Sequence, residues 1–590
     1  MKTSINGNEF FEFFKNGAIE VINNKDYLDS INIFPVEDKD TGSNLAYTLK
    51  FIVEFSTIED SFYKTINSMS LISLENARGN SGVIFAQFLT GIAKETKERE
   101  YIDFKEFIDL LKKSSEYVYN SIANPFEGTI ISFIRDWTKY LKMNSFKFNN
   151  FNDIFLKSFE HANELLLETK VHMKKLKNKN IVDSGANGFL FFLKGICKFF
   201  NGEFLELENL ITKEKIDIKE ENFNCIKYRY CCECLLETKF LDKHILDLKK
   251  ELLNIGDSLI LAGSNKLKHI HIHCNEIYKL FNLISSYGII KKPKVEDMKI
   301  QKNFNKNKEN TVILIDSIAD IDEKIINKNN IDIIPINIFI DESHYLDKIT
   351  INHDNFNEKY KRAKSIKSSQ PNIIQIKNKI NFLKKYYKNI LIITVSDKLS
   401  GTYMTMLDYL KKNESTNPNI KIINSKLNSG AQGLLVLEAI KLIKEHKNIN
   451  NIVDELERIK EDIKIYVSIN DLSNILRGGR LNTKLKKLIE FFNLKITISL
   501  DRNGKGILKY IGIFRRKNEK YILKKINKLK KENKDLNYCI VYSGSKKNKR
   551  KFIKEIEGKI GKKALYETKI SSVIAMHSGS DAIGIAVKIN

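Results

Sequence analysis

Two kinds of hydrophobic periodicity, on either side of a polar stretch, constrain this chain most. Before residue 200, apolar residues recur at three- and four-residue spacing in NEFFEFFKNGAIEVIN and FIDLLKKSSEYVYNSI, which predicts amphipathic helices. After residue 310, Ile- and Val-rich runs such as TVILIDS, IDIIPINIF, NILIITVS, IKIINS and YCIVYSG alternate with helical patterns. That alternation is typical of a buried, mostly parallel sheet. We therefore expect an all-α region followed by an α/β region.

A third pattern lies between these two. From about Ile216 to Val295, strand patterns such as DSLILAG and KHIHIHC mix with helices, and the stretch QKNFNKNKEN at 301–310 has almost no apolar residues. A chain of 590 residues is too long for one core. We expect three domains, at 1–200, 216–298 and 311–590, with a linker over 299–310.

The composition excludes some classes of function. The formal charge of +25 invites a nucleic-acid interpretation, but the basic residues are spread along a chain rich in Lys, Asn and Ile, so we expect no nucleic-acid partner. Seven Cys in 590 residues do not make a disulfide framework. The first residues, MKTSINGNEFFEFFKNG, show no secretory-signal pattern, and the run GFLFFLKGICKFF is too short to span a bilayer. A cytoplasmic location is expected.

Four polar loops interrupt the helical region. In the first, FPVEDKDTGSN, Asp38 and Asp40 flank one residue and precede Thr-Gly-Ser-Asn, a pattern that suits a hard divalent cation beside a phosphate. A turn with an Asp helix cap is the alternative. The loops ARGNSG, NPFEGT and VDSGANG add further small polar residues: Asn80, Ser81, Glu127, Gly128, Thr129, Asp183, Ser184 and Gly185. Each loop alone is ordinary, but four in one helical domain indicate a binding end. No P-loop pattern is present.

The strand HIHIHC carries a second group of candidates. Side chains alternate faces along a strand, so His269, His271 and His273 project to one side. Two such His with a Cys from YRYCCECLLE would make a zinc-like set, and a merely polar strand face is the alternative. In the last region, runs end in Ser317, Ser396, Ser425 and Ser543, and hydroxyls at the carboxyl ends of strands suggest a bound polar head group.

The motifs NIFPVEDKDTGSN, ARGNSGVIFAQ, EGTI and VDSGANGFL resemble the kinase domain of bacterial fatty acid kinase, which is related to the ATP-binding subunit of dihydroxyacetone kinases. The resemblance implies an eight-helix barrel that binds Mg-ATP at one end, with Asp38 and Asp40 as catalytic ligands of two Mg²⁺ ions. It also implies an ATP site made of Thr41, Gly42, Ser43, Asn44, Asn80, Ser81, Gly128, Thr129, Asp183 and Gly185. One departure is Lys39, where the family usually has Gly; if φ is positive there, Lys is strained by ~1 kcal/mol.

The middle region resembles the middle domain of the same family, through Tyr228–Cys231 and His271–Asn275. The resemblance implies an α/β domain that binds a structural Zn²⁺ through Cys231, His271 and His273. The neighbouring residues that complicate this assignment are Cys232, Cys234, Cys274 and His269.

The last 280 residues resemble the DegV-type fatty-acid-binding proteins, through ILIDSIADI, SSQPN, SDKLSGTY, SGAQGLLVLEA, LRGGRL and MHSGSDAIGIA. This resemblance implies a two-lobed α/β fold in which Ser368 and Ser400 bind the fatty acid carboxylate. His577 lies where the family has a His near the head group, and Arg480 either recognises phosphate or is a surface residue. The family's Thr-Gly-Pro-Gly after that His is Ser-Gly-Ser-Asp here.

The two resemblances together imply an ATP-dependent fatty acid kinase in one polypeptide, which makes acyl phosphate and ADP. The implied partners are a fatty acid, a downstream acyltransferase that uses acyl phosphate in phospholipid synthesis, a second copy of the chain in a homodimer, and transiently a membrane surface. The alternatives are a non-catalytic lipid-binding regulator or scaffold, and a dihydroxyacetone-type kinase for another small substrate.

Overall fold

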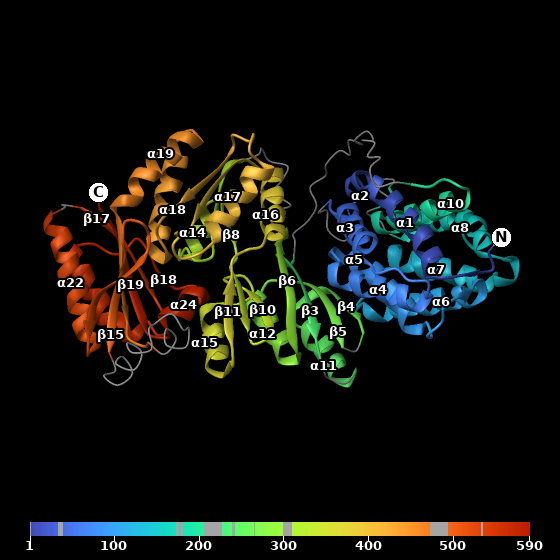
Figure 1. Ribbon diagram of the computed structural model, residues 1–590, viewed down its shortest axis with the longest axis horizontal. Coiled ribbons are helices and arrows are strands. Elements are labelled where there is room, and N and C mark those ends of the chain that lie inside the picture. Colours follow the sequence, from blue (N-terminus) through green and yellow to red (C-terminus); the bar gives the residue numbers. More distant parts are fainter. Residues whose placement is uncertain are drawn as a thin grey trace. The chain divides into compact units, whose positions relative to one another are not determined.

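The structure is a computed structural model of the chain (Figure 1). It describes residues 2–33, 39–172, 176, 181–205, 227–238, 242–264, 266–298, 309–472, 494–532 and 535–589. The chain divides into two compact units, Met1–Asn303 and Phe304–Asn590. Among the described residues, we find no helix with the length and apolar content needed to cross a bilayer.

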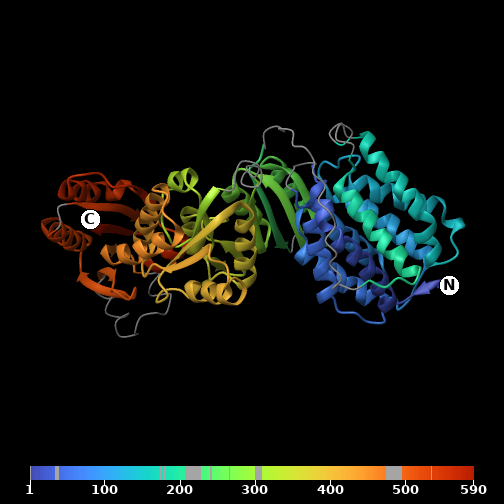
Figure 2. The same ribbon diagram turned by 90° about the horizontal axis from the view of Figure 1, so that it is seen from above.

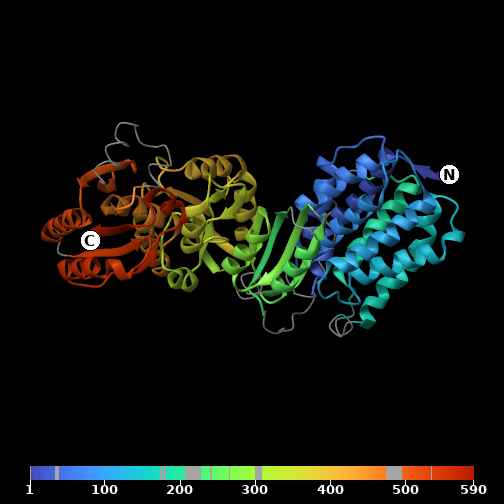
Figure 3. The ribbon, with the colours of Figure 1, turned by 90° about the horizontal axis from the view of Figure 1, so that it is seen from below.

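Helices that pack around one Phe-rich core form the first part of the first unit (Figure 3). They are α1 (Gly7–Asn23), α2 (Lys25–Ser30), α3 (Thr41–Phe55), α4 (Phe62–Asn76), α5 (Gly79–Glu95), α6 (Phe104–Ser121), α7 (Ile130–Met143), α8 (Phe151–His172) and α10 (Ser184–Phe200). A short helix η1 (Ser145–Lys147) and a pair of two-residue strands, β1 (Ser4–Ile5) and β2 (Ile102–Asp103), complete this part. Helix α1 lies against α3 and α10, where the rings of Phe14 and Phe85 contact Phe192 at centroid distances of 5.1 and 5.0 Å. The predicted helical N-terminal region is confirmed.

Local sequence fixes where these helices begin. Asn6 and Glu9 form a capping box at α1, in which each side chain accepts a hydrogen bond from the other residue's backbone N–H. The Asp103 side chain accepts from the N–H groups of Lys105 and Glu106 at the start of α6. These caps set the residue at which α1 and α6 begin.

An antiparallel sheet forms the second part of the first unit (Figure 1). Its strands run in the order β4 (Gly256–Gly263), β5 (Leu267–Cys274), β3 (Tyr230–Glu237) and β6 (Ile289–Asp297), and it carries α11 (Asp242–Leu253) and α12 (Ile277–Tyr287). Ile260 and Ala262 of β4 belong to the same buried core as the helices. The Gly263 N–H also donates to Gln87 Oε1 of α5 at 2.6 Å, so the sheet and the helices are packed directly together.

The second unit contains a four-stranded parallel sheet with helices on both faces (Figure 2). The strand order is β13 (Ile420–Asn424), β12 (Tyr387–Thr394), β7 (Glu309–Asp316) and β8 (Ile331–Ile334). The helices of this part are α14 (Glu323–Lys328), α16 (Ile373–Tyr386), α17 (Thr402–Asn413), α18 (Ser429–Lys444) and α19 (Ile449–Ile459). Strand β7 begins at Glu309, inside the stretch expected to be a linker.

Two further sheets depart from the predicted parallel arrangement. One has the order β16 (Gly506–Gly512), β15 (Lys495–Leu500), β14 (Ile463–Ile469), β19 (Ala582–Ile589), β17 (Leu536–Tyr542) and β18 (Glu567–Lys569), and only β17 and β18 pair in parallel. The other, β10 (Ser343–Leu346), β9 (Asn337–Ile340) and β11 (Ile366–Ser369), is antiparallel. The remaining elements are α15 (His353–Arg362), η3 (Lys460–Asp462), α22 (Arg515–Glu532), η4 (Lys547–Lys549), α23 (Arg550–Ile560) and α24 (Ser572–Ser578).

The prediction of a mostly parallel sheet is therefore correct for one part of this unit and wrong for the other. The run IDIIPINIF, taken as one strand, is split at Pro335 into β8 of the parallel sheet and β9 of the small antiparallel sheet. Proline has no N–H to donate and so ends a ladder. The run YCIVYSG forms β17, which pairs antiparallel with β19; a buried apolar run alone does not reveal its neighbour's direction. The α/β class of the C-terminal region is confirmed.

Candidate functional site

The four polar loops of the helical part each open a helix, and the four helix N-termini adjoin one another. Helices α3, α5, α7 and α10 begin at Thr41, Gly79, Ile130 and Ser184. The Ile130 N–H donates to Asp183 Oδ1 at 3.1 Å. A Cβ at Gly185 would lie 3.2 Å from Ser81 Oγ, and one at Gly79 would lie 2.4 Å from Asn44 Nδ2. The N-terminus of a helix attracts anions through its free N–H groups and its dipole, and here four of them meet.

The first loop is held by two residues that sequence reasoning missed. Asn32 Oδ1 accepts hydrogen bonds from the N–H groups of Asp40 and Thr41, each at 3.1 Å. Asp29 accepts from the Ser43 N–H at 2.9 Å and from the Ser43 hydroxyl at 2.5 Å. The N–H groups of Thr41 and Ser43, expected to hold phosphate, thus have acceptors within the protein. No pattern in the sequence marked either residue, because both lie in or just after α2 rather than in the loop.

The Asp-X-Asp pair itself is partly visible. Asp40 precedes the first turn of α3, whereas Asp38 lies outside the described residues. Between them, Lys39 has a φ of +54°. The condition set by the sequence, a positive φ at the position where the related kinases usually have Gly, is therefore met, and the backbone of Lys39 is strained.

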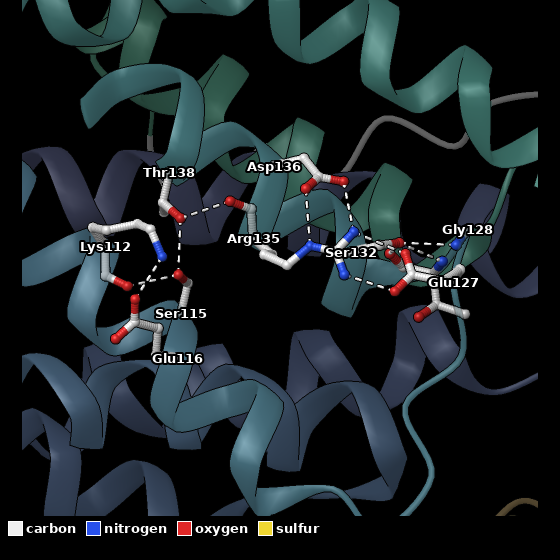
Figure 4. A network of polar contacts seen from close by, with 10 residues as sticks. Lys112, Ser115, Glu116, Glu127, Gly128, Ser132, Arg135, Asp136 and Thr138 are labelled. Carbon is white, nitrogen blue, oxygen red and sulfur yellow. Dashed lines mark hydrogen bonds and ion pairs between the residues drawn. The ribbon is translucent and has the colours of Figure 1, made fainter. Parts of the chain in front are cut away.

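The loop before α7 is fixed by a polar network (Figure 4). The N–H groups of Gly128 and Thr129 donate to Ser132 Oγ at 2.9 and 3.1 Å. The Arg135 guanidinium binds both oxygens of Glu127, at 2.6 and 2.8 Å, and its Nε binds Asp136 at 2.9 Å. Glu127, Gly128 and Thr129 are thus held by their own helix, which fixes the loop beside Asp183.

Two polar groups at this end have the environment of ligand-binding residues. Asn80 Oδ1 is buried and has no hydrogen-bond partner among the described residues. Asp183 is also buried, and its Oδ1 caps α10 by accepting from the Ala186 N–H at 2.7 Å. Burial raises the pKa of Asp183 to about 6, although three backbone hydrogen bonds oppose that shift. A buried polar atom without a partner is costly unless a ligand or water satisfies it.

The antiparallel sheet brings together the predicted zinc ligands. Cys231 on β3 lies directly across from His273 on β5, and His271 is two residues further along the same face. One ligand atom from each residue lies within 4.8 Å of the other two, and Cys231 Sγ is 4.0 Å from His271 Nδ1. The His271 Nε2 atom is buried without a partner among the described residues. A thiol and two imidazoles at this spacing fit a tetrahedral zinc site.

The other Cys and His of the region are separated from this cluster. Cys232, Cys234 and Cys274 project from the opposite face of the sheet, because side chains alternate along a strand. The sulfur atoms of Cys232 and Cys274 lie 3.6 Å apart there. His269 shares the face of the cluster, but its Nδ1 is 3.0 Å from the Leu74 carbonyl oxygen.

Burial and neighbouring charges shift the pKa values of the residues on the face of the cluster. Burial, together with the carboxylates of Glu233 and Glu296, raises the pKa of the Cys231 thiol well above its ordinary value. Burial lowers the pKa of His273 to about 3, which keeps this ring neutral, as a metal ligand must be. Burial alone would raise the pKa of Glu233, but the Lys294 charge and the His271 hydrogen bond outweigh it and hold that pKa well below its usual range. Glu233 is a further residue that the sequence reasoning missed.

In the second unit, the loop that follows β11 adjoins the loop that precedes α17. Ser368 lies on β11, and Ser400 precedes α17 with its Oγ 2.9 Å from Thr402 Oγ1. Gln370 joins the two loops: its amide donates to Thr405 Oγ1 at 2.6 Å, and its side chain covers Gly401. His577 lies in α24, and Arg480 lies outside the described residues.

The serines at the strand ends are buried and hydrogen-bonded within the protein. Ser317, Ser396, Ser425 and Ser543 are fully buried. Their hydroxyls are hydrogen-bonded within the protein, to groups of Asp347, Gly504, Leu427 and Ala582 in that order. These hydroxyls therefore stabilise the loops beyond the strands, and their contact with a bound head group stays a prediction.

The fold and the site define a multidomain protein with a helical domain whose helix N-termini converge, a sheet with a Cys/His cluster, and an α/β unit. Family models identify its parts. A DAK2 domain matches residues 35–198, the middle domain of the FakA-like fatty acid kinases matches 227–304, and the DegV family matches 310–590. The chain thus joins a DAK2 domain, a FakA-like middle domain and a DegV domain in one polypeptide.

Individual relatives cover only part of the chain. An uncharacterized protein of Staphylococcus epidermidis is 30% identical over 316 residues, which are 51% of this chain and 56% of that protein. One of Staphylococcus aureus is 31% identical over 320 residues, 51% of this chain and 57% of that protein. The chain spans about half the length of the curated relatives it matches.

Solved DegV structures cover the other half. A DegV family protein from Thermus thermophilus, described for its fatty acid binding, is 21% identical with a TM-score of 0.43. The match covers 48% of this chain and 100% of the Thermus chain. DegV of Bacillus subtilis, described as a fatty acid binding protein, is 24% identical with a TM-score of 0.42 over the same shares.

Proposed function

We propose that this chain is an ATP-dependent fatty acid kinase that carries its own lipid-binding domain and converts a bound fatty acid to acyl phosphate. The observation that carries the proposal is the presence of a DAK2 domain, a FakA-like middle domain and a DegV domain in one polypeptide. The middle domain is named for a fatty acid kinase, and the DegV relatives are described as binding fatty acids, so both halves point to one substrate class.

The converging helix N-termini would form the nucleotide end, in the eight-helix barrel expected for this domain. Asp38 and Asp40 would hold Mg²⁺, which supplies neutralisation of the charge on the transferred phosphoryl group when bound. Asn44, Asn80 and Ser81 line the meeting point of α3 and α5, and Asn80 Oδ1 is free to bind a ligand. Asp183 fixes α7 against α10 through the Ile130 N–H.

The acceptor needs little activation. A fatty acid carboxylate is already ionised at neutral pH, so the chain needs no strong general base and acts mainly by positioning. Ser368 on β11 and Ser400 in the loop before α17 would bind that carboxylate, with His577 and Arg480 as further head-group residues. Cys231, His271 and His273 would hold Zn²⁺, which supplies a structural cross-link between β3 and β5 when bound. We further propose that two copies of the chain form a homodimer and that the chain contacts a membrane surface transiently. An acyltransferase would then use the acyl phosphate that the chain makes.

The test is ADP release by the purified chain with Mg-ATP and oleate, with acyl phosphate trapped as a hydroxamate. Two variants and matched controls separate the two halves. Asp40→Ala is compared with Asp26→Ala, an exposed carboxylate of α2, and Ser368→Ala with Ser369→Ala, its exposed neighbour on the other face of β11. We expect Asp40→Ala and Ser368→Ala to abolish or strongly reduce oleate-dependent turnover and both controls to retain it.

The alternatives give different results. Turnover with dihydroxyacetone but not with oleate would identify a kinase for another small substrate. Oleate binding without nucleotide binding would identify a non-catalytic lipid-binding regulator, the outcome that the strained Lys39 would explain. Equal activity of Ser368→Ala and Ser369→Ala would remove Ser368 from the head-group site.

A further inference from the structure

One buried carboxylate lies between the Cys/His cluster and the loop that opens α5. Glu233 is on β3, directly across from His271 on β5, and its side chain is 5% exposed. Its two oxygens have partners from three separate segments of the first unit: the ring of His271, the backbone of Gly79 and the ammonium group of Lys294. No other hydrogen bond described above joins the cluster face to the polar loops.

On the side of the cluster, Glu233 Oε1 is 3.0 Å from His271 Nδ1. This contact fixes the proton of a neutral His271 on Nδ1 and leaves the lone pair on Nε2, the atom that is buried without a partner among the described residues. A carboxylate that holds the second nitrogen of a metal-binding His orients the ring and makes it a better ligand. Glu233 therefore prepares His271 for a metal.

On the side of the helical domain, the same oxygen accepts the Gly79 N–H at 2.7 Å. Gly79 is at a φ of +57°, and its Cα lies so close to Asn44 that a Cβ would be 2.4 Å from Asn44 Nδ2. The loop that carries Asn80 and Ser81 is thus fixed between Glu233 on one side and the first turn of α3 on the other. Moving the Glu233 carboxylate would move this loop.

Lys294 on β6 completes the environment. Its Nζ is 3.3 Å from Glu233 Oε2 and 2.9 Å from Glu296 Oε1. Glu296 shares this lysine with Glu233 but, among the described residues, has no hydrogen bond to His271 or Gly79. The pair therefore offers a matched comparison between two carboxylates on one cation, of which only Glu233 joins the two sites.

We infer that Glu233 is a positioning residue that couples the metal site of the middle domain to the nucleotide loop of the helical domain. The inference rests on the proposed function for the identity of the two ligands. Filling the metal site holds His271, and through Glu233 it holds Gly79 and the loop beyond it. Metal binding then favours nucleotide binding, and by linkage nucleotide binding favours metal binding by the same factor.

The experiment measures both affinities and their coupling in the full chain. Co²⁺, whose visible absorption reports thiolate coordination, is titrated into metal-free protein with and without saturating Mg-ADP, and Mg-ADP is titrated with and without Co²⁺. In the unmodified chain we expect each ligand to tighten the other by at least about fivefold. Glu233→Gln should weaken Co²⁺ binding by about 10- to 100-fold and reduce the coupling to about onefold.

Controls separate this role from a structural one. Glu296→Gln should keep the coupling of the unmodified chain. Because Glu233→Gln removes one of the two carboxylates that Lys294 contacts, the double variant Glu233→Gln/Lys294→Met tests the same loss without the lysine charge. Folding of each variant is followed by fluorescence of Trp137, the single Trp of the chain, which is fully buried among the helices.

Each possible result tests one part of the inference: the role of Glu233, the coupling itself, or the proposed function on which it rests. Wild-type coupling in Glu233→Gln and in the double variant, or equal loss of coupling in Glu296→Gln, would overturn the role of Glu233. Independent binding of Co²⁺ and Mg-ADP to the unmodified chain would overturn the coupling while leaving the proposed kinase intact. Absence of Mg-ADP binding in the unmodified chain would instead remove the proposed function, and the coupling with it.

Discussion

Two loops at the proposed nucleotide end of the helical domain have the same unusual backbone conformation with different residues. Lys39, one residue before the cap of α3, has a φ of +54°, and Gly79, the first residue of α5, has a φ of +57°. The Lys39 side chain is exposed to solvent. Gly79 is held by Glu233 on its N–H and by Asn44 against its Cα. A positive φ therefore tolerates a side chain where solvent surrounds it and excludes one where a neighbour fills the space.

The contrast also explains a property of the whole chain. Among the described residues, non-glycine residues at positive φ include Lys39, Lys292, Lys348 and Lys426. Lysine thus occupies several backbone positions that normally favour Gly or Asn. At Gly79 the contact with Asn44 also requires the absence of a side chain, whereas at Gly202 no atom lies within 4 Å of an added Cβ.

The largest expected effect tests the requirement for space. Gly42, in the first turn of α3, has an ordinary φ, but a Cβ there would lie 2.1 Å from the Lys25 carbonyl oxygen. Backbone cannot move aside as a side chain can, so Gly42→Ala should destabilise the helical domain by about 3 kcal/mol, at the upper end for overpacking. The measurement is the Trp137 unfolding transition, which should fall on the order of 10 °C.

A matched control for Gly42→Ala is Ser43→Ala, one residue further along the same helix. It removes the hydroxyl hydrogen bond to Asp29 without adding volume, and should cost about 1 kcal/mol. Equal transitions for the two variants would show that α2 and α3 separate easily, and that space at Gly42 is not what fixes this loop.

The second prediction concerns Asp183, the buried carboxylate that accepts a hydrogen bond from the first residue of α7. Burial raises the pKa of Asp183 to about 6 from its ordinary 3.8, so the folded state holds this proton more tightly than the unfolded state. The folded state is therefore penalised as the pH rises from about 4 to 6. Relative to wild type, Asp183→Asn should gain roughly 2 kcal/mol over that window. Unfolding of the ligand-free chain at pH 4.5 and pH 7, read from Trp137, gives the difference.

If the difference in stability between wild type and Asp183→Asn is the same at both pH values, the backbone hydrogen bonds to Asp183 fully offset its burial. Asp26→Asn, an exposed carboxylate of α2, serves as the control and should show no pH-dependent gain.

The third prediction separates strain from contact at positive φ. Gly79→Ala should lose about 1–2 kcal/mol from backbone strain. Because the new Cβ would displace Asn44, it should also weaken Mg-ADP binding, by about tenfold or more if the loop shifts by the 1 Å scale that disrupts positioned sites. Gly202, at a φ of +84° with no atom within 4 Å of the added Cβ, is the control. Gly202→Ala should show the stability loss alone.

If Gly202→Ala weakens nucleotide binding as much as Gly79→Ala, the effect on binding is a general consequence of lower stability. If neither variant is destabilised, positive φ carries no strain in this chain, and the contrast between Lys39 and Gly79 loses its physical basis. Both transitions are read from Trp137, and Mg-ADP affinity is measured by calorimetry.

The sequence predicted features that depend on local spacing. The four loops at helix N-termini follow from small polar residues between amphipathic runs, and the grouping of His271 with His273 follows from the alternation along one strand. At Lys39 the sequence raised only the condition of a positive φ, which the structure meets. Each of these needs only residues within a few positions of one another.

Features that depend on pairing between distant segments were missed. Asn32 and Asp29 stabilise the first loop from 8 to 14 residues upstream, and Glu233 reaches Gly79 across 154 positions. The direction of β17 beside β19 likewise depends on a partner, since a buried apolar run is the same in either direction. The packing of distant segments decides these contacts, and periodicity along a single element does not reveal it.

The smallest expected effect returns to Lys39, where the contrast began. Lys39→Gly removes the Cβ that makes a positive φ unfavourable, a gain of about 1–2 kcal/mol. Glycine also enlarges the entropy of the unfolded chain, which costs about 0.5–1 kcal/mol, so the net stabilisation should be about 0.5 kcal/mol. Lys39→Ala keeps the Cβ while removing the charge, and should show no gain. A rise in the Trp137 transition of about 1–2 °C for Gly but not for Ala would identify backbone strain as the cause.

If Lys39→Gly also tightens Mg-ADP binding relative to Lys39→Ala, the strained lysine limits the metal geometry at Asp40. If it does not, the turn held by Asn32 already fixes Asp40, and the exposed lysine is neutral for function.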